Sequence, residues 1–227
     1  MPVIVIASPK GGAGKTTTAL ILATEFAHMG LDVSLLDCDA TAEDTGLSVW
    51  AERTGDRLPP RLSLHLGVHE RDVIKLINER DGDGRLVVVD LGGAASRMAS
   101  RAISQADLVL VVLRPKPLDS ALATAAIAMI KEEEEQIARS IPFALAIGSG
   151  GMIKTKAHRA ILEDAAKAGL DVIQPELGER AAYAQMFGAE GGGVRDVPRV
   201  GSFEAAIDNA QAFARAVLER LMEAGDE

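Results

Sequence analysis

The sequence predicts an α/β fold with a doubly wound, mostly parallel sheet and helices on both faces. Three observations predict it: the strand-like runs are apolar throughout instead of alternating, longer helical patterns separate them, and a glycine-rich loop follows the first run. Continuously apolar strands are typical of parallel sheets that are covered on both faces. A sheet of this kind binds its ligand at the carboxyl ends of its strands, so the site is expected along that edge.

The elements alternate along the chain. Strands are expected over 3–7, 32–37, 61–66, 85–90, 107–113 and 143–148, and helices over 15–29, 69–80, 96–105, 118–139, 155–168 and 202–224. The last helix is amphipathic and acidic, which favours docking on the sheet over binding at a membrane surface. The glycine-rich segment 188–201 predicts a mobile loop, and the run KEEEEQ at 131–136 predicts a solvated helical face. Since no repeat or linker divides the chain, we expect one domain over residues 1–227.

Composition excludes several classes of protein. The chain has 227 residues and is 48% hydrophobic, which excludes a disordered chain. Its net charge of −9 excludes a globally basic nucleic-acid binder, although a local basic patch remains open. The single cysteine, Cys38, forbids an internal disulfide and fits a reducing compartment. No apolar run has the length of a membrane span or the pattern of a signal peptide, so a cytoplasmic protein without a membrane partner is expected.

The loop after the first strand reads KGGAGKTTTAL, residues 10–20. Glycines let backbone N–H groups turn inward around a phosphate, and a helix start adds partial positive charge. Lys15 is expected to reach the β- and γ-phosphates of ATP, the Thr16 hydroxyl to ligate Mg²⁺, and Thr17 to contact the α-phosphate. The residues expected to hold the nucleotide here are Gly11, Gly12, Ala13, Gly14, Lys15, Thr16 and Thr17.

Carboxylates follow two of the strands. The second strand ends in Asp37-Cys38-Asp39, and strand alternation places both acids on one side, with Cys38 on the packed face. The run RLVVVDLGG, residues 85–93, is a Walker B candidate whose Asp90 can hold the water shell of Mg²⁺. The glycines after Asp90 would let this loop approach the γ-phosphate. A nucleotide and Mg²⁺ are therefore expected at this edge, and the family resemblance described below implies that the nucleotide is ATP.

A strict phosphate-loop pattern requires glycine at position 9, where this chain has Pro9. The segment from Lys10 instead fits K-G-G-x-G-K-T-T, the deviant Walker A signature. On these residues the sequence resembles the ParA/MinD family of ATPases, which have the P-loop NTPase fold, and looks most like short ParA-type partition proteins without an N-terminal DNA-reading domain. The resemblance covers nearly the whole chain.

The resemblance implies roles for individual residues. Lys10 would reach across a dimer interface to the phosphates bound by the partner subunit, Asp39 would position or activate the attacking water, and Asp37 would support Mg²⁺ through its water shell. The family commonly continues Asp-Pro-Gln where this chain has Asp39-Ala40-Thr41, so contacts made by that Pro-Gln pair are in doubt.

The segment 173–193 resembles the stretch that lines the adenine in relatives, which makes Pro175, Glu176 and Leu177 candidates for an adenine pocket. The run RPKPLD at 114–119 resembles a family loop near the dimer face, but it is equally well a plain turn in which Pro117 starts a helix. Tyr183 and Trp50 are expected to pack.

The function implied by the resemblance is a weak, partner-stimulated ATP hydrolase. ATP would close a sandwich homodimer that binds nonspecific DNA and positions a plasmid, a chromosome or other cargo, and that is nucleoid-associated while ATP-bound. A ParB-like adaptor or its equivalent would stimulate hydrolysis and reset it. Either a DNA-binding patch or ordinary surface charge explains the basic residues of 151–200, which are Lys154, Lys156, Arg159, Lys167, Arg180, Arg195 and Arg199.

Four alternatives stay open at this point. The chain could position a protein organelle or transfer DNA, or it could be a small-molecule ATP-dependent ligase of the same fold, similar to dethiobiotin synthetase. A MinD-like membrane-cycling regulator is opposed by the acidic last helix. A nucleotide-binding scaffold with little turnover is opposed by Asp39.

Overall fold

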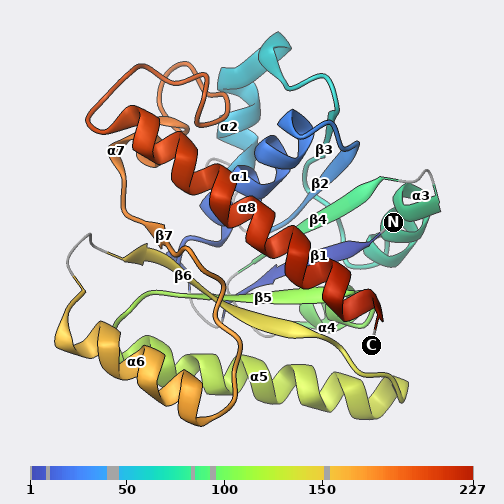
Figure 1. Ribbon diagram of the computed structural model, residues 1–227. Coiled ribbons are helices and arrows are strands. Elements are labelled where there is room, and N and C mark those ends of the chain that lie inside the picture. Colours follow the sequence, from blue (N-terminus) through green and yellow to red (C-terminus); the bar gives the residue numbers. More distant parts are fainter. Residues whose placement is uncertain are drawn as a thin grey trace.

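The computed structural model of the chain describes residues 2–8, 11–39, 46–82, 85–92, 96–150 and 154–226. Its centre is a seven-stranded sheet in the order β3-β2-β4-β1-β5-β6-β7, and every pairing in it is parallel (Figure 1). The strands are β1 (Val3–Ala7), β2 (Val33–Cys38), β3 (Leu62–His65), β4 (Leu86–Leu91), β5 (Leu108–Leu113), β6 (Phe143–Gly150) and β7 (Leu177–Gly178). The doubly wound parallel fold predicted from the sequence is confirmed.

Helices cover both faces of this sheet. They are α1 (Lys15–His28), α2 (Leu47–Thr54), the 3₁₀ turn η1 (Gly55–Arg57), α3 (Val73–Gly82), α4 (Arg97–Ile103), α5 (Pro117–Ile137), α6 (Lys156–Lys167), α7 (Ala181–Gln185) and α8 (Phe203–Asp226). Pro117 begins α5, as the turn interpretation predicted. The sequence patterns did not indicate α2, α7 or β7. Among the described residues, no helix combines the length and apolar character needed to cross a membrane.

The two faces have separate hydrophobic cores. One core joins the sheet to α1, α2, α7 and α8, and the other joins it to α3, α4, α5 and α6. All residues of β1, β2, β4 and β5 are buried, which explains why these strands are apolar without alternation. Trp50 of α2 is fully buried in the first core, so the expectation that it packs is confirmed.

The segment 188–201 is packed against α2, and the prediction of a mobile loop there is wrong. The Gly192 N–H donates to Thr54 Oγ1 (2.9 Å), and Trp50 Nε1 donates to the Gly192 carbonyl oxygen (2.9 Å). A Cβ at Gly191 would lie 2.4 Å from Thr54 Oγ1. The glycines therefore permit close backbone approach, a use of glycine that sequence composition does not distinguish from flexibility.

A buried ion pair completes this attachment. Glu25 of α1 is 1% exposed, and Arg195 donates to both of its carboxylate oxygens, from Nε at 3.1 Å and from Nη2 at 2.7 Å. These hydrogen bonds, the largest cause, raise the pKa of Arg195 despite its partial burial. The pair fixes the segment on α1 as well as on α2.

The acidic run of α5 is only partly a solvated face. The Glu134 carboxylate accepts hydrogen bonds from the Ile141 N–H (2.8 Å) and the Ser140 hydroxyl (3.3 Å), and it pairs with Lys131 at 2.6 Å. Glu133 is 7% exposed. Glu133 is thus buried and Glu134 joins the end of α5 to the residues that follow it, while Glu132 and Glu135 are exposed as predicted.

Candidate nucleotide-binding site

The glycine-rich loop joins β1 to α1 at the carboxyl edge of the sheet. Gly12 and Gly14 have positive φ angles of 74° and 99°, and Gly14 is the residue before the first turn of α1. No side chain caps this helix start, so its backbone N–H groups are available to an anion. This arrangement is an anion-binding cradle. The predicted trans-acting residue Lys10 lies outside the described residues.

Lys15 places a positive charge inside the protein directly after this cradle. Its side chain is buried, and the loss of solvation lowers the pKa of Lys15, while the nearby Asp90 and Asp39 carboxylates oppose that shift. The ammonium group is thus poorly solvated and held by negative charge. A phosphate group would add a further anionic partner for this poorly solvated ammonium.

The acids of the second and fourth strands are neighbours. Asp37 of β2 and Asp90 of β4 are paired in register, and both lie on the α1 face of the sheet because the residues flanking them pack on the other face. The Thr16 hydroxyl donates a hydrogen bond to Asp90. Burial raises the pKa of Asp90 to about 7, against the opposing effects of Thr16 and Lys15.

Asp37 and Cys38 behave as strand alternation predicts. Burial raises the pKa of Asp37, whose Oδ1 accepts a hydrogen bond from the Asp39 N–H (3.1 Å). Cys38 belongs to the opposite core, and burial raises its pKa to about 12. The thiol therefore stays protonated near neutral pH and is a core residue, as expected.

Asp39 lies against the loop that follows β4. A Cβ built at Gly92 would be 3.2 Å from Asp39 Oδ1, so only a small residue lets the two loops meet. Gly93 and the departures from the family pattern at Ala40 and Thr41 lie outside the described residues. The two strand ends that carry the predicted metal-supporting acids are therefore in direct contact.

The oxygen donors at this edge fit a magnesium site. Asp90 Oδ1 is buried and has no hydrogen-bond partner in the part of the chain that the structure describes. Thr16 and Asp37 add a hydroxyl and a second carboxylate beside it. Hard oxygen ligands and carboxylates reached through water are what Mg²⁺ prefers, and an ion there would satisfy the buried oxygen.

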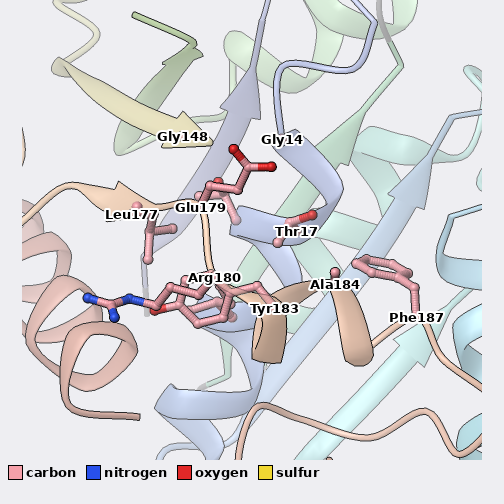
Figure 2. A pocket seen from close by; sticks show the side chains of 12 residues that line it. Gly14, Thr17, Gly148, Leu177, Glu179, Arg180, Tyr183, Ala184 and Phe187 are labelled. Carbon is pink, nitrogen blue, oxygen red and sulfur yellow. The ribbon is translucent and has the colours of Figure 1, made fainter. Parts of the chain in front are cut away.

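A cavity of about 180 Å³ opens beside the phosphate loop, and Figure 2 shows the side chains that line it. Its lining includes Gly14, Thr17 and Thr18 on one side and residues 177–187 on the other, together with Gly148 and Ile21. The cavity therefore continues the phosphate cradle toward β7 and α7.

The three adenine candidates have different positions. Leu177 lines the cavity, whereas Pro175 and Glu176 are not among the lining residues. The Glu176 carboxylate instead pairs with Lys154 (3.2 Å) and with His158 Nε2 (2.8 Å), the latter an ion pair when the imidazole is protonated. Glu176 thus acts as a structural link between β7 and α6.

Several lining residues were not assigned to the site from the sequence. They include Gly148, Glu179, Arg180, Tyr183 and Phe187. A Cβ at Gly148 would lie 3.2 Å from the Ala13 carbonyl oxygen, so this glycine lets β6 support the phosphate loop. A glycine at the carboxyl end of a predicted central strand was a usable signal for that role. Tyr183 is packed, as expected, but it also borders the cavity.

The basic residues of 151–200 do not all point to a surface patch. Arg195 pairs with the buried Glu25, and Arg180 Nε donates to Asn209 Oδ1 at 3.1 Å. Lys156 and Arg159, at the start of α6, are exposed. The prediction of a DNA-binding patch stays a prediction, with fewer exposed members than the sequence suggested.

Comparisons with known proteins identify the family of this chain. Residues 4–223 match the family model described as the CobQ/CobB/MinD/ParA nucleotide binding domain. The chain is 43% identical over 226 residues to Protein ParA from Rhizobium radiobacter, covering 99% of each chain.

Solved structures share the fold at low sequence identity. The MinD cell division protein of Aquifex aeolicus has a TM-score of 0.71 at 20% identity, covering 96% of this chain and 98% of that one. The cobyrinic acid a,c-diamide synthase of Mycobacterium smegmatis, solved with bound ADP and magnesium, has a TM-score of 0.66 at 20% identity, covering 96% and 94%. By its phosphate loop, its sheet and its full-length similarity to ParA, the chain belongs to the CobQ/CobB/MinD/ParA family of nucleotide-binding domains.

Proposed function

We propose that this protein is a ParA-type ATPase that dimerises on ATP, binds DNA without sequence preference and positions cargo. One observation carries the proposal. At one edge of the sheet, Lys15, the hydrogen-bonded pair Thr16–Asp90, and Asp37 with Asp39 converge beside the cavity that continues the phosphate loop. The full-length similarity to Protein ParA supports the same function over a small-molecule ligase.

In this mechanism, the chain mainly positions groups for phosphoryl transfer. Backbone N–H groups at the start of α1 and the Lys15 ammonium hold the phosphates. Magnesium, when bound, neutralises phosphate charge, and Thr16, Asp37 and Asp90 would hold it directly or through water. Asp39 orients the attacking water, since its carboxylate lies at the loop that follows Asp90. Hydrolysis is slow until a partner protein stimulates it.

Dimerisation depends on Lys10, by the resemblance of its motif to the family signature. Two triphosphates packed face to face repel each other, and burying them requires added positive charge. Lys10 supplies that charge from the partner subunit, so ATP stabilises the dimer and hydrolysis releases it. Sizing the protein with ADP and with a nonhydrolysable ATP analogue tests this step. We expect a monomer with ADP and a dimer with the analogue.

Variants sharpen the sizing experiment. Lys10→Ala should stay monomeric with the analogue, while Lys75→Ala, at an exposed lysine of α3, should dimerise as the parent does. Equal dimerisation of Lys10→Ala and the parent would refute the trans role. A parent that stays monomeric while saturated with the analogue would remove the switch from the proposal and leave a nucleotide-binding protein.

DNA binding is the remaining step. A dimer doubles any basic surface, and counterion release makes nonspecific binding sensitive to salt. A gel shift with the ATP analogue at two salt concentrations should show binding that weakens at the higher salt, and no binding with ADP. ATP turnover that requires a small metabolite, and ignores DNA and protein, would instead identify a ligase.

A further inference from the structure

The wall of the cavity that is formed by residues 177–187 has little local support of its own. It consists of β7, which is two residues long, and α7, which is five. The pairing of β7 with β6 is irregular, since the register shifts between Gly148 and Gly150, and no side chain caps the start of α7. Elements this short are unstable alone, so something outside the wall must hold it in place.

Asn209 of α8 supplies that support through both ends of its amide. Asn209 Nδ2 donates to the Glu176 carbonyl oxygen (2.9 Å), before β7. Asn209 Oδ1 accepts from Arg180 Nε (3.1 Å) and lies 3.0 Å from the Tyr183 hydroxyl, at the start of α7. One side chain therefore joins the wall on both sides of β7. Figure 2 shows Arg180 extending toward α8, with Tyr183 beside it.

The position of Asn209 is itself fixed. The neighbouring Ala206, Ala210 and Phe213 of α8 are buried in the core that this helix shares with α1. The Tyr183 hydroxyl also lies 3.0 Å from the Ala206 carbonyl oxygen, and burial raises the pKa of Tyr183, so the phenol stays a hydrogen-bond donor. The wall is thus held at a fixed position relative to α1, the helix that begins directly after the glycine-rich loop.

We infer that Asn209 is a positioning residue for the nucleoside part of the nucleotide. It sets the distance between the wall residues Leu177 and Tyr183 and the start of α1 without touching the nucleotide, because it is not among the residues that line the cavity. The inference rests on the proposed function, in that the cavity must receive base and ribose. If the inference holds, replacing Asn209 weakens the binding of ligands that contain a nucleoside and leaves the binding of phosphates alone unchanged.

The test compares ADP with inorganic pyrophosphate, which offers the phosphate loop two phosphates and the wall nothing. The Kd of each is measured by calorimetry with magnesium for the parent, Asn209→Ala, Tyr183→Phe and the control Gln211→Ala, an amide two positions further along α8. For Asn209→Ala we expect ADP to bind about tenfold more weakly and pyrophosphate to change by less than about twofold. Tyr183→Phe keeps the ring and loses one of the three bonds, so about threefold is expected for ADP. Gln211→Ala should match the parent.

The outcomes distinguish a positioning role of Asn209 in nucleoside binding from a purely structural role. A merely structural Asn209 would lower the melting temperature and leave the ratio of the two Kd values at the parent value, and that unchanged ratio would overturn the inference. If Asn209→Ala does not fold, Tyr183→Phe decides by the same ratio. If the parent binds ADP no more tightly than pyrophosphate, the cavity takes no nucleoside, and the proposed function fails first, whatever the variants do.

Discussion

The phosphate half of the site is built mainly from residues that are close together in the sequence, whereas the nucleoside half is built from elements that are far apart in it. The phosphate half comes from one contiguous stretch, residues 11–18, together with acids at the ends of two adjacent strands. The nucleoside half combines α1, β6, β7, α7 and, through Asn209, α8. The first half contains poorly solvated charges, whereas the second half is lined by both apolar and polar residues and is held by hydrogen bonds to the Asn209 amide. Phosphate affinity is thus encoded locally, whereas the shape of the nucleoside cavity depends on tertiary packing.

The largest loss of ligand affinity is expected at Lys15. An equal loss for ADP and pyrophosphate would show that the phosphate half binds anions whether or not a nucleoside is attached. Lys15→Met should weaken ADP and pyrophosphate alike by at least about 100-fold, since it removes a charge-assisted contact worth about 3 kcal/mol. Calorimetry with both ligands measures this. Lys75→Met, at the exposed lysine of α3, should bind both as the parent does. A loss confined to ADP would erase the distinction between the halves.

Gly191→Ala tests how much the packing of segment 188–201 against α2 contributes to the stability of the fold. The added Cβ meets Thr54 Oγ1 at 2.4 Å, and the residue has a positive φ of 63°. We expect a loss of about 3 kcal/mol in the free energy of unfolding in urea. Gly201→Ala, with a φ of 56° and open space around it, should lose only about 1 kcal/mol of backbone strain. Equal losses would mean that the contact with α2 contributes nothing.

Asp90 tests the charge that the phosphate half buries. Without nucleotide or metal, the folded chain keeps the Asp90 proton up to about pH 7, whereas an unfolded aspartate loses it near pH 4. The folded state therefore binds more protons between these values, and its stability falls as the pH rises through them. From pH 5 to pH 7.5 in a chelating buffer, the parent should lose about 2 kcal/mol more than Asp90→Asn.

The control for this pH series is Asp56→Asn, at an exposed carboxylate of η1. It should keep the slope of the parent. Burial also raises the pKa of Asp37, so the stability of the Asp90→Asn variant should still fall over this pH range, but by less than that of the parent. A parent whose stability rises over this range would contradict the buried, proton-retaining carboxyl.

The smallest effect is expected at Gly148, where the two halves meet. In Gly148→Ala the new methyl group presses on the Ala13 carbonyl and on Val112, each at 3.2 Å. ADP should bind about fivefold more weakly, a loss of about 1 kcal/mol, and pyrophosphate should follow it, because the displaced group belongs to the phosphate loop. Gly225→Ala, with no neighbour within 4 Å, is the matched control and should bind normally.

The same contrast decides how much could be predicted from the sequence. The strands from β1 to β6 were predicted within about two residues, because apolar runs and their spacing are local properties. Asp37 and Asp90 could each be placed near the carboxyl end of a strand from the sequence, whereas their pairing in register came from the structure. The pattern could not reveal β7 and α7, since their hydrogen bonds to Asn209 come from about 30 positions further along the chain.

The prediction of a mobile loop over 188–201 was wrong for a related reason. Its glycines match those of a flexible linker, and only Thr54, 137 positions earlier than Gly191, shows that they permit contact. The orphaned oxygen of Asp90 and the poorly solvated Lys15 likewise become visible only once the sheet and α1 are assembled. Sequence motifs thus predicted which groups meet the phosphates, and packing determined what surrounds them.

The parallel order of the sheet has a consequence for synthesis on the ribosome. The glycine-rich loop emerges early, but β1 pairs only with β4 and β5, and Ala13 rests on Gly148 of β6. A nascent chain that has been translated only through β3 has neither neighbour for its first strand. Ligand capture during translation must therefore await roughly the first two thirds of the polypeptide, and early codons specify a loop that later codons make useful.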